Sequence, residues 1–484
     1  MKRLGILIVA YNAASTLAQV LDRIPRDFVP RIERVLVSDD ASTDATYLVG
    51  LGYQQQSDLP LTVISQPENL GYGGNQKAAY HWAMEHGLDI VVLLHGDGQY
   101  APEVLPNIVE PLELDKCDAV LGSRMMDRGG ARRGGMPLYK FVGNKILTRF
   151  ENAVVGMDLS EWHTGYRAYS LAALRDLPFD GNSDGFDFDT QIIVQLHEAG
   201  KRIVEVPIPT YYGGEISYVN GMQYAYDIVR HVLRYRAHKM GFGTGETAFA
   251  SSAYEMKEGA TTSHGRLLAW LAARQPARVL DLGCSDGRLA EALRVHGHRV
   301  TGVDRTALPG VEVGGDEALH AVLDAGIPDE VGDGYDVVLA ADVFEHVCEP
   351  ERLLAQARTV LAPGGSVMTS VPNFAHWYPR LRVAAGRFDY DRRGILDRDH
   401  LRFFTRRSFE HLARGAGFAV RRREAVGLPL EVVERGGAAG TGSGDASSGA
   451  GIGRGVQHLD HLGVAAWPSL FAYQYLFELE PVVT

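Results

Sequence analysis

The stretch GILIVAYN, residues 5–12, is a short apolar run that ends in polar residues. Runs of the same kind recur along the first half of the chain, between segments whose apolar residues have helical spacing. They are RVLVSDD from Arg34, LTVIS from Leu61, DIVVLL from Asp89, DAVLGS from Asp118 and KRIVEVPI from Lys201. Continuous apolar runs of this length are typical of a parallel sheet that helices cover on both faces. The first half is therefore predicted to be a doubly wound α/β domain.

A second series of apolar runs predicts a second domain of the same class. It consists of ARVLDLGC from Ala277, HRVTGVD from His298, YDVVLAAD from Tyr335 and GGSVMTSVP from Gly364. Strands that alternate with helices form a sheet with helices packed on its faces. We therefore expect two doubly wound domains, each with a core of its own.

Two segments of unusual composition suggest how the domains are divided. GFGTGETAFASSAYE from Gly241 is rich in Gly, Ser and Thr, which is typical of a linker. We expect one domain over residues 1–242, a linker over 243–262 and a second domain over 263–484. Residues 436–455 are dominated by Gly, Ala, Ser and Thr and are predicted to be a flexible insertion in the second domain. Apolar residues return at 464–477, where we expect a strand or helix that packs back on the sheet.

The overall composition limits the class of partner. The chain has 484 residues and a formal net charge of -12, which opposes broad binding to nucleic acid. Its three cysteines are far apart in the sequence, which indicates neither a disulfide framework nor a metal knuckle and fits a reducing cytoplasm. No stretch has the roughly 20 apolar residues that span a bilayer, and the first residues lack the features of a signal peptide. We expect a cytoplasmic protein with at most peripheral membrane contact.

Polar side chains follow three strands of the first predicted sheet. The first strand ends in Ala10-Tyr11-Asn12, the second in Ser38-Asp39-Asp40 and the fourth in residues 95–99, HGDGQ. Open α/β sheets bind ligands beyond the carboxyl ends of their strands. A carboxylate there can bind a nucleotide, and Asp97 with a neighbouring oxygen donor can hold Mg²⁺ or Mn²⁺ against a diphosphate. The alternative for each acidic residue alone is a helix cap or a turn.

With these motifs, residues 3–239 resemble the family-2 glycosyltransferases of the GT-A fold, especially the dolichyl-phosphate mannose and glucose synthases. The motifs that support the resemblance are VAYN at Val9, SDDAST at Ser38, ENLGYGGN at Glu68, HGDGQYAPE at His95, GSR at Gly122, TGYRAYS at Thr164 and EVPIPTYYGGEISY at Glu205. The resemblance implies a nucleotide-diphosphate sugar as donor. It implies a donor site that contains Ala10, Tyr11, Asn12, Asp40, Gly71, Gly74, Asn75, Asp97, Arg124 and Arg167.

Within that site the resemblance assigns the metal to Asp97 and Gln99. Arg124 and Arg167 are predicted to meet phosphate oxygens, because a guanidinium fork suits that task; the alternative is that they anchor loops. The chain departs from the family at His95, where an acidic residue is usual, and at Gln191, where relatives often have Glu.

The acceptor side leaves more than one possibility open. Transfer to a hydroxyl needs a general base, for which Asp187 and Asp189 are the candidates. A lipid phosphate that is already ionised needs no base, and a small molecule or a glycan is also compatible with the sequence. The helix predicted around residues 227–239 has Ile228, Val232 and Tyr235 on one side and basic residues on others. It fits a membrane surface, but we expect it to pack its apolar stripe on the domain.

The second domain contains a turn suited to a nucleoside cofactor. VLDLGCSDG, residues 279–287, is an apolar strand that breaks into a Gly-rich turn, where Gly283 and Gly287 permit close approach of the backbone to a ligand. Asp304 ends the next strand, at the spacing expected of a carboxylate that binds ribose hydroxyls. Together these features predict a nucleoside-containing cofactor.

With these motifs, residues 263–484 resemble the class I S-adenosylmethionine-dependent methyltransferases, and in particular the ubiquinone-biosynthesis type of O-methyltransferase. The further motifs are GVDR at Gly302, YDVVLAADVFEHV at Tyr335, LAPGGSVMTSVPN at Leu361 and GILDRDHLRFFT at Gly394. The resemblance implies S-adenosylmethionine as cofactor. It implies contacts with that cofactor by Asp281, Gly283, Ser285, Gly287, Asp304, Asp316, Asp342 and Phe344.

O-methylation also needs a group that removes the hydroxyl proton. His346 and His400 are the candidates, and His400 is preferred because it lies in the polar cluster DHLR before two phenylalanines. The alternative is a structural histidine that binds a backbone carbonyl. The fusion of the two domains suggests that one attaches a sugar and the other O-methylates that sugar or its acceptor. Two alternatives stay open: a polyprenyl-phosphate glycosyltransferase whose methyltransferase acts separately, and a chain in which one half is a non-catalytic scaffold.

Overall fold

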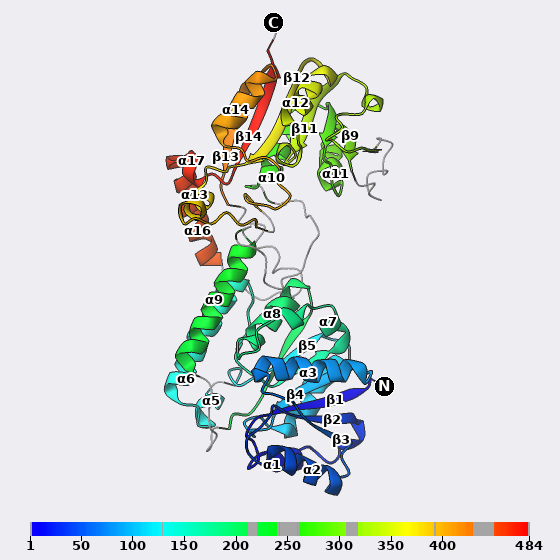
Figure 1. Cartoon of the computed structure of the whole chain (residues 1–484), viewed down its shortest axis with the longest axis vertical. Coiled ribbons are helices and arrows are strands. Elements are labelled where there is room, and N and C mark those ends of the chain that lie inside the picture. Colours follow the sequence, from blue (N-terminus) through cyan, green and yellow to red (C-terminus); the bar gives the residue numbers. More distant parts are fainter. Residues whose placement is uncertain are drawn as a thin grey trace. The chain divides into compact units, whose positions relative to one another are not determined.

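The computed structural model contains two compact units, one of residues 2–236 and one of the described residues from 237 onward (Figure 1). Each unit is built on a seven-stranded sheet, so two α/β sheets are confirmed. The structure describes residues 2–127, 129–211, 220–239, 242, 259, 261–305, 318–391, 394–428 and 450–482. Most of the predicted linker and residues 436–449 of the predicted insertion lie outside these ranges.

The sheet of the first unit has the strand order β3-β2-β1-β4-β6-β5-β7. Its strands are β1 (Leu4–Ala10), β2 (Ile32–Asp39), β3 (Leu61–Ser65), β4 (Ile90–His95), β5 (Ala119–Ser123), β6 (Arg167–Ser170) and β7 (Ile203–Pro207). Its helices of four or more residues are α1 (Leu17–Asp22), α2 (Thr46–Gln56), α3 (Gly71–Glu85), α4 (Leu105–Glu113), α5 (Gly130–Arg133), α6 (Leu138–Val155), α7 (Leu171–Arg175), α8 (Phe188–Glu198) and α9 (Gly221–Lys239).

One strand corrects the prediction of a parallel sheet. β6 runs antiparallel to both β4 and β5, so the first sheet is mixed. The chain reaches β6 only after the long excursion through α5 and α6, and a strand that returns by such a route can enter the sheet in either direction. The other pairs, β1 with β2, β1 with β4, β2 with β3 and β5 with β7, are parallel as expected.

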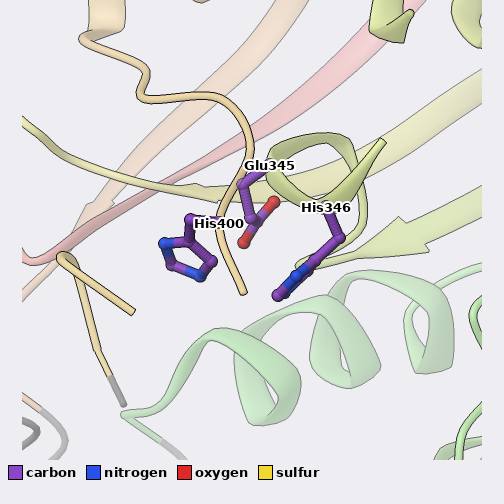
Figure 2. A group of neighbouring side chains, drawn as sticks. All are labelled: Glu345, His346 and His400. Atoms are coloured by element: carbon purple, nitrogen blue, oxygen red, sulfur yellow. The ribbon is translucent and has the colours of Figure 1, made fainter. Parts of the chain in front are cut away.

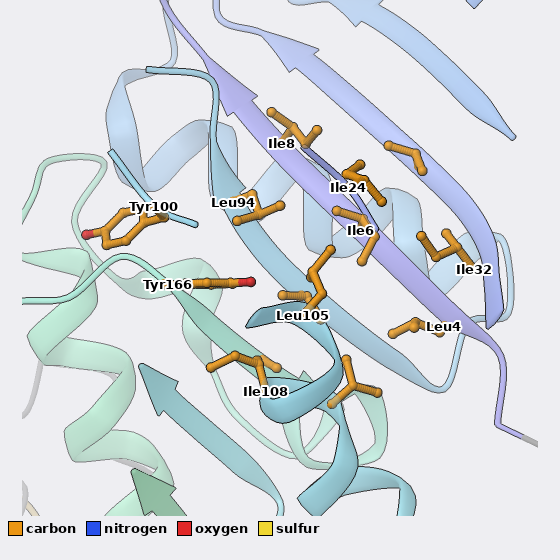
Figure 3. Packing of buried hydrophobic residues seen from close by; sticks show 14 of the residues in the cluster. Leu4, Ile6, Ile8, Ile24, Ile32, Leu94, Tyr100, Leu105, Ile108 and Tyr166 are labelled. Carbon is orange, nitrogen blue, oxygen red and sulfur yellow. The ribbon is translucent and has the colours of Figure 1, made fainter. Parts of the chain in front are cut away.

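The apolar runs form strands because both of their faces are buried. Leu4, Ile6 and Ile8 of β1 point into a cluster with α1 and α4, together with Tyr100 and Tyr166 (Figure 3). Leu7 and Val9, which alternate with them, enter the core under α3 and α8. A strand buried on both faces has no polar alternation, which is why its sequence is continuously apolar.

Helix α9 uses its apolar stripe inside the first unit. Ile228, Val232 and Tyr235 are buried there with residues of α6 and α8. The expectation that this stripe packs on the domain is confirmed, and the same stripe does not face a membrane. Among the described residues, no helix combines the length and apolar character needed to cross a bilayer.

The sheet of the second unit has the order β10-β9-β8-β11-β12-β14-β13. Its strands are β8 (Arg278–Leu282), β9 (Arg299–Asp304), β10 (Ala318–His320), β11 (Tyr335–Ala341), β12 (Leu361–Pro372), β13 (Phe418–Val426) and β14 (Gln474–Pro481). β14 lies between β12 and β13 and is antiparallel to both. The helices described here are α10 (Ser263–Ala272), α11 (Arg288–Val295), α12 (Pro350–Val360), α13 (Trp377–Ala384), α14 (Arg406–Gly415), α16 (Ala450–Ala466) and α17 (Pro468–Phe471).

The region after the predicted insertion is more ordered than its composition suggested. Helix α16 begins at Ala450, so residues 450–455 are helical rather than part of a flexible insertion. In the sequence, Ile452, Val456 and Leu459 recur at intervals of four and three residues, which favours a helix through the Gly-rich stretch. The prediction of a strand or helix that packs back on the sheet is confirmed by β14.

Candidate active sites

The carboxyl ends of β1, β2 and β4 meet at one edge of the first sheet. The register pairs Ala10 with Asp39 and Val9 with His95, and the amide of Asp40 donates to the carbonyl of Ala10 at 2.9 Å. The loops that follow these strands are therefore neighbours. The structure brings the predicted nucleotide-binding residues together, as the strand order requires.

Asn12 ties two of these loops to each other. It adopts a positive φ of 49°. Its amide donates to Ser42 Oγ at 2.8 Å, and its Oδ1 accepts from the Thr43 amide at 2.9 Å. Tyr11, beside it, keeps 40% of its surface exposed. Asn12 thus shapes the loop, while Tyr11 offers a ring face to a ligand.

Two adjacent carboxylates end β2. Asp40 accepts from the amide of Leu70 at 2.8 Å, and burial raises the pKa of its carboxyl. Asp39 is 1% exposed, and its Oδ1 has no hydrogen-bond partner among the described residues. A buried acceptor without a donor is rare in folded proteins and suggests a ligand group that supplies one. The sequence motif contained Asp39, but the implied donor site did not.

The glycines of ENLGYGGN have a packing function in this structure. Gly71 has a φ of +78°, and a Cβ there would lie 2.6 Å from the carbonyl oxygen of Asp184. At Gly74 an added Cβ would contact Leu70 and the Asp184 carboxylate at 3.0 and 3.2 Å. Asn75 is 2% exposed and donates to the carbonyl of Ser38 at 3.0 Å. These three residues hold α3 against its neighbours.

The predicted metal ligands lie directly after β4. Asp97 is exposed, and its Oδ1 accepts from the amide of Gln99 at 2.9 Å. His95, at the usual position of an acidic residue, contacts the edges of Tyr72 and Tyr100, and its Nε2 is 3.2 Å from the Tyr72 hydroxyl. Burial lowers the pKa of His95, so the imidazole is neutral near pH 7. The site therefore has one exposed carboxylate beside a neutral ring, a donor set that fits a cation whose remaining ligands come from a diphosphate.

Arg124 does not offer a free guanidinium fork to a phosphate. It is 7% exposed, its backbone amide and Nε donate to Glu161 at 2.7 and 2.9 Å, and Nη2 also bonds Glu161. Burial alone would raise the pKa of Glu161, but the Arg124 charge and its hydrogen bonds hold that pKa below its usual value. Asn144 of α6 donates to the same carboxylate at 2.9 Å. The arginine anchors a loop, which was the alternative considered from the sequence.

Arg167 is likewise bonded inside the protein. It has no exposed surface, and its guanidinium donates to the carbonyls of Thr164, Asp189 and Trp162 at 2.6, 2.8 and 3.0 Å. Arg167 belongs to β6, an inner strand of the sheet, and its side chain enters the interior. Its guanidinium faces backbone carbonyls in this structure, and its contact with phosphate oxygens stays a prediction.

The two candidate bases differ in their surroundings. Asp189 is 6% exposed, accepts from the Tyr72 hydroxyl at 2.9 Å and lies 3.5 Å from Arg167 Nη2. Asp187, at the start of α8, is half-buried and accepts from Gln191 Nε2 at 2.8 Å. Asp189 is therefore engaged by a hydroxyl and a guanidinium, and its role as a base stays a prediction. Asp187 remains accessible.

The Gly-rich turn of the second unit has the geometry of a ligand cradle. Gly283, Ser285 and Gly287 have φ values of 75°, 46° and 76°. The amide of Ser285 donates to Asp304 Oδ2 at 3.0 Å, which ties the turn to the end of β9. A Cβ at Gly283 would lie 2.8 Å from Val343, so only glycine fits where the turn passes the next loop.

Asp281 is the most perturbed carboxyl of this turn. It is 2% exposed, and its Oδ2 has no hydrogen-bond partner in the part of the chain that the structure describes. Burial, with a smaller contribution from the charge of Asp304, raises the pKa of Asp281 to about 7. An unpartnered buried carboxylate beside a Gly-rich turn suits a cationic group of a ligand.

Two further residues predicted to contact the cofactor bind or pack against other residues of the protein. Asp342 has a φ of 55°, and its Oδ1 accepts from Ser370 and from Gln474, the latter at 2.8 Å. Phe344 has no exposed surface and packs in the core with Phe409, and its contact with the cofactor stays a prediction. Asp316 lies outside the described residues.

The two predicted methyl-transfer bases come together with a third residue. Glu345, His346 and His400 present ligand-type atoms that all lie within 4.8 Å of one another. Figure 2 shows the Glu345 carboxylate between the two imidazole rings, whose centroids are 4.8 Å apart. Glu345 and His346 come from the turn after β11, and His400 comes from the segment before α14.

Backbone carbonyls fix how the two histidines are protonated. Nδ1 of His346 is 3.0 Å from the carbonyl oxygen of Asp399, and Nδ1 of His400 is 3.3 Å from that of Ile395. A carbonyl only accepts, so Nδ1 carries a proton, and in the neutral ring the lone pair is on Nε2. Such a contact is the usual support of a metal-binding histidine, and it equally orients a general base. Glu345 was not among the predicted site residues, although it stands in DVFEHV beside His346.

Comparison with known proteins divides the chain in the same two parts. The model of glycosyl transferase family 2 matches residues 5–177, and a methyltransferase-domain model matches residues 254–422. The chain is 32% identical to the undecaprenyl-phosphate mannosyltransferase of Micrococcus luteus, over 43% of this chain and 82% of the relative. It is 29% identical to the ubiquinone biosynthesis O-methyltransferase of Aeromonas salmonicida, over 31% and 66%. The glucosyl-3-phosphoglycerate synthase of Mycobacterium tuberculosis superposes with a TM-score of 0.37 at 17% identity, covering 53% of this chain and 82% of that one.

Proposed function

Because the chain belongs to the family 2 glycosyltransferases and carries a class I S-adenosylmethionine-dependent methyltransferase domain, we propose that it performs two transfers on one product. In the first, a sugar passes from a nucleotide-diphosphate donor to a lipid phosphate. In the second, a hydroxyl of that sugar is O-methylated. The fusion of the two activities in one chain supports a shared product, and the name of the Micrococcus luteus relative supports the acceptor class.

The likeness to the undecaprenyl-phosphate mannosyltransferase of Micrococcus luteus is the observation that supports a phosphate acceptor. A hydroxyl acceptor would need a carboxylate to take its proton; Asp189 is bonded by Arg167 and Tyr72, which leaves Asp187 for that task. A phosphate acceptor arrives ionised and attacks without a base. Asp187 is then free to orient the acceptor, and the proposal does not require it to take up a proton.

On the donor side, the chain contributes an exposed carboxylate and a shaped loop. Asp97 and the side chain of Gln99 would hold a divalent cation, which would neutralise charge on the departing diphosphate. Asp39, with its unpartnered oxygen, would accept a hydrogen bond from the nucleotide, and the exposed ring of Tyr11 would lie against the base.

In the second unit, the turn of residues 283–287 would receive S-adenosylmethionine. Asp304 would hold the ribose hydroxyls, and Asp281 would face the ammonium group of the methionine portion. The cofactor supplies an electrophilic methyl group, so the task of the protein is to align the acceptor oxygen and remove its proton.

The pKa of Asp281 makes cofactor binding dependent on pH. Only the ionised carboxylate attracts an ammonium group, and with a pKa of about 7 the affinity for S-adenosylmethionine should rise about tenfold between pH 6 and pH 8. Asp281→Asn should bind weakly at both values and show no such rise. Isothermal titration calorimetry across this range measures the effect.

The raised pKa of Asp281 also predicts how the stability of the ligand-free fold changes with pH. The folded-state pKa lies above the ordinary value of 3.8, so ionising Asp281 destabilises the ligand-free fold. That destabilisation grows from about pH 4 and is complete above pH 7. Asp281→Asn should therefore raise the thermal midpoint at pH 8 while it weakens cofactor binding. A loss of both stability and binding would contradict the assigned pKa.

Glu345, His346 and His400 would activate the hydroxyl to be methylated. Their three ligand-type atoms fit a divalent cation, which would lower the pKa of the bound hydroxyl. The alternative is that His400 takes the proton directly through Nε2. Both require the acceptor oxygen to lie at this cluster.

Product analysis tests the proposed function. The full chain is incubated with a panel of nucleotide sugars, a polyprenyl phosphate, Mn²⁺ and S-adenosylmethionine labelled in its methyl group. The expected product is a lipid-linked sugar that carries the label, formed only when the nucleotide sugar is present. A labelled product that forms without the sugar donor would favour a separately acting methyltransferase. Failure of either transfer with every substrate would leave that unit as a scaffold.

A further inference from the structure

Helix α6 of the first unit has an apolar face that no other described part of the chain covers. Leu138, Val142 and Ile146 follow one another at intervals of four residues, which places them along one side of the helix. They are 60%, 44% and 61% exposed, and Tyr139 beside them is 73% exposed. Large apolar side chains grouped in this way on a surface mark an interaction site more often than scattered ones do.

The segment that contains this face carries charges of one sign only. Residues 129–150 contain five basic residues and no Asp or Glu, although the whole chain has a net charge of -12. The basic residues are Arg132, Arg133, Lys140, Lys145 and Arg149. Lys145 and Arg149 are exposed on α6 itself. Arg133 pairs with Asp127 just before this segment, at 2.7 Å. The partner that fits an apolar face with this border is apolar and negatively charged.

The opposite side of α6 is bonded to buried residues inside the first unit. Asn144 donates to Glu161, which holds Arg124 at the end of β5. Glu151 is fully buried and accepts from Thr190 of α8 at 3.0 Å. The exposed face therefore does not arise from a poorly packed helix. One side of α6 is bonded to the interior of the unit, and the other is exposed among the described residues.

We propose that α6 docks the first unit on an anionic lipid bilayer, with its apolar face at the boundary between headgroups and acyl chains. A helix with apolar residues on one face and Lys and Arg along its border binds in the plane of such a surface, and the long basic side chains reach the headgroup phosphates. The proposal rests on the proposed function, because a lipid-phosphate acceptor is presented by a bilayer. It goes beyond it by assigning the docking surface to α6 rather than to α9, whose apolar stripe is buried.

Vesicle binding of the full chain tests the proposal. Vesicles of phosphatidylcholine are compared with and without phosphatidylglycerol, at low and high NaCl, by co-sedimentation. The wild type should bind the anionic vesicles and be released by salt. Each basic residue near such a surface contributes about fivefold in affinity. Lys145→Glu, which replaces an attraction by a repulsion, should lower the partition coefficient about tenfold or more, and Ile146→Glu should do the same.

A matched control separates docking from a general effect of added charge. Val295→Glu places the same side chain at a 79% exposed apolar position on α11 of the other unit, and it should bind vesicles as the wild type does. Equal binding by wild type and Ile146→Glu would overturn the proposal. So would a change in oligomeric state with Ile146→Glu at unaltered vesicle binding, because the face would then join copies of the chain.

Sugar transfer measured in detergent keeps this test apart from that of the proposed function. With a short-chain polyprenyl phosphate dissolved in detergent, Ile146→Glu should retain the rate of the wild type and lose activity only on vesicles. Loss of vesicle binding with retained transfer in detergent supports the docking surface. Normal vesicle binding by a wild type that transfers no sugar to any lipid phosphate would reject the proposed acceptor and leave the docking surface intact.

Discussion

Replacing Asp97 by asparagine is expected to lower the rate of sugar transfer by about 10²–10³. Asp97 is the exposed carboxylate after β4, and its neighbour His95 is a neutral imidazole where the family usually has an acid. The protein therefore offers a cation a single charge at this point. An amide of the same size keeps the hydrogen bond from the Gln99 amide but removes that charge. Initial rates with a labelled nucleotide sugar at saturating Mn²⁺ measure the effect.

Donor binding distinguishes loss of the cation from loss of the fold. For the wild type, Mn²⁺ should tighten the binding of the nucleotide sugar, and for Asp97→Asn it should have no influence. Glu110→Gln on α4, an exposed carboxylate outside the site, serves as the matched control and should behave as the wild type. Metal-dependent binding that survives in Asp97→Asn would show that other residues hold the cation.

Glu345→Gln and His400→Asn are each expected to slow methyl transfer by about 10²–10³, with little change in the affinity for S-adenosylmethionine. Both residues lie in the cluster of Figure 2, and neither belongs to the turn of residues 283–287. Rates of methyl transfer at saturating cofactor, together with calorimetric binding, separate the chemical step from cofactor binding. His411→Asn, which changes an exposed histidine on α14, is the control.

Chelation decides between the two ways in which this cluster can work. If a cation activates the hydroxyl, EDTA should abolish methyl transfer and added Mg²⁺, Mn²⁺ or Zn²⁺ should restore it. If His400 is the base, EDTA should have no effect on the rate of methyl transfer. Wild-type rates in both variants would remove the cluster from the mechanism altogether.

The sequence predicted the donor edge of the first sheet because the strands that form it are long and apolar. β1, β2 and β4 end in polar motifs, and parallel strands place such ends side by side. β6 was not predicted, since its four residues begin with an arginine and end with a serine. The direction of the Arg167 side chain follows from that strand. An arginine in such a motif is readily taken as a ligand for phosphate, and here its side chain lies in the interior.

In the second unit too, the sequence predicted where the motifs lie but not which way their side chains point. The Gly-rich turn and Asp304 could be placed from spacing, because the turn and the end of the next strand are neighbours in any such fold. Phe344, His346 and Glu345 share one short turn, and spacing along the chain does not tell which of them faces the core. The encounter of His346 with His400 depends on a loop more than fifty residues later. The family assignment is confirmed for both halves, while the roles of individual residues remain predictions.

Because β14 lies between β12 and β13, the second sheet can be completed only after the first during translation. Residues 474–481 fill the gap between β12 and β13, which have no contact with each other in the sheet without them. On the ribosome, all strands of the first sheet have been made once residue 207 is synthesised, so that unit can fold while the rest is still being translated. The second sheet must wait for its last described strand, and until then β12 and β13 expose unpaired edges. Chaperones that shield strand edges should therefore act on the second half of the nascent chain and spare the first.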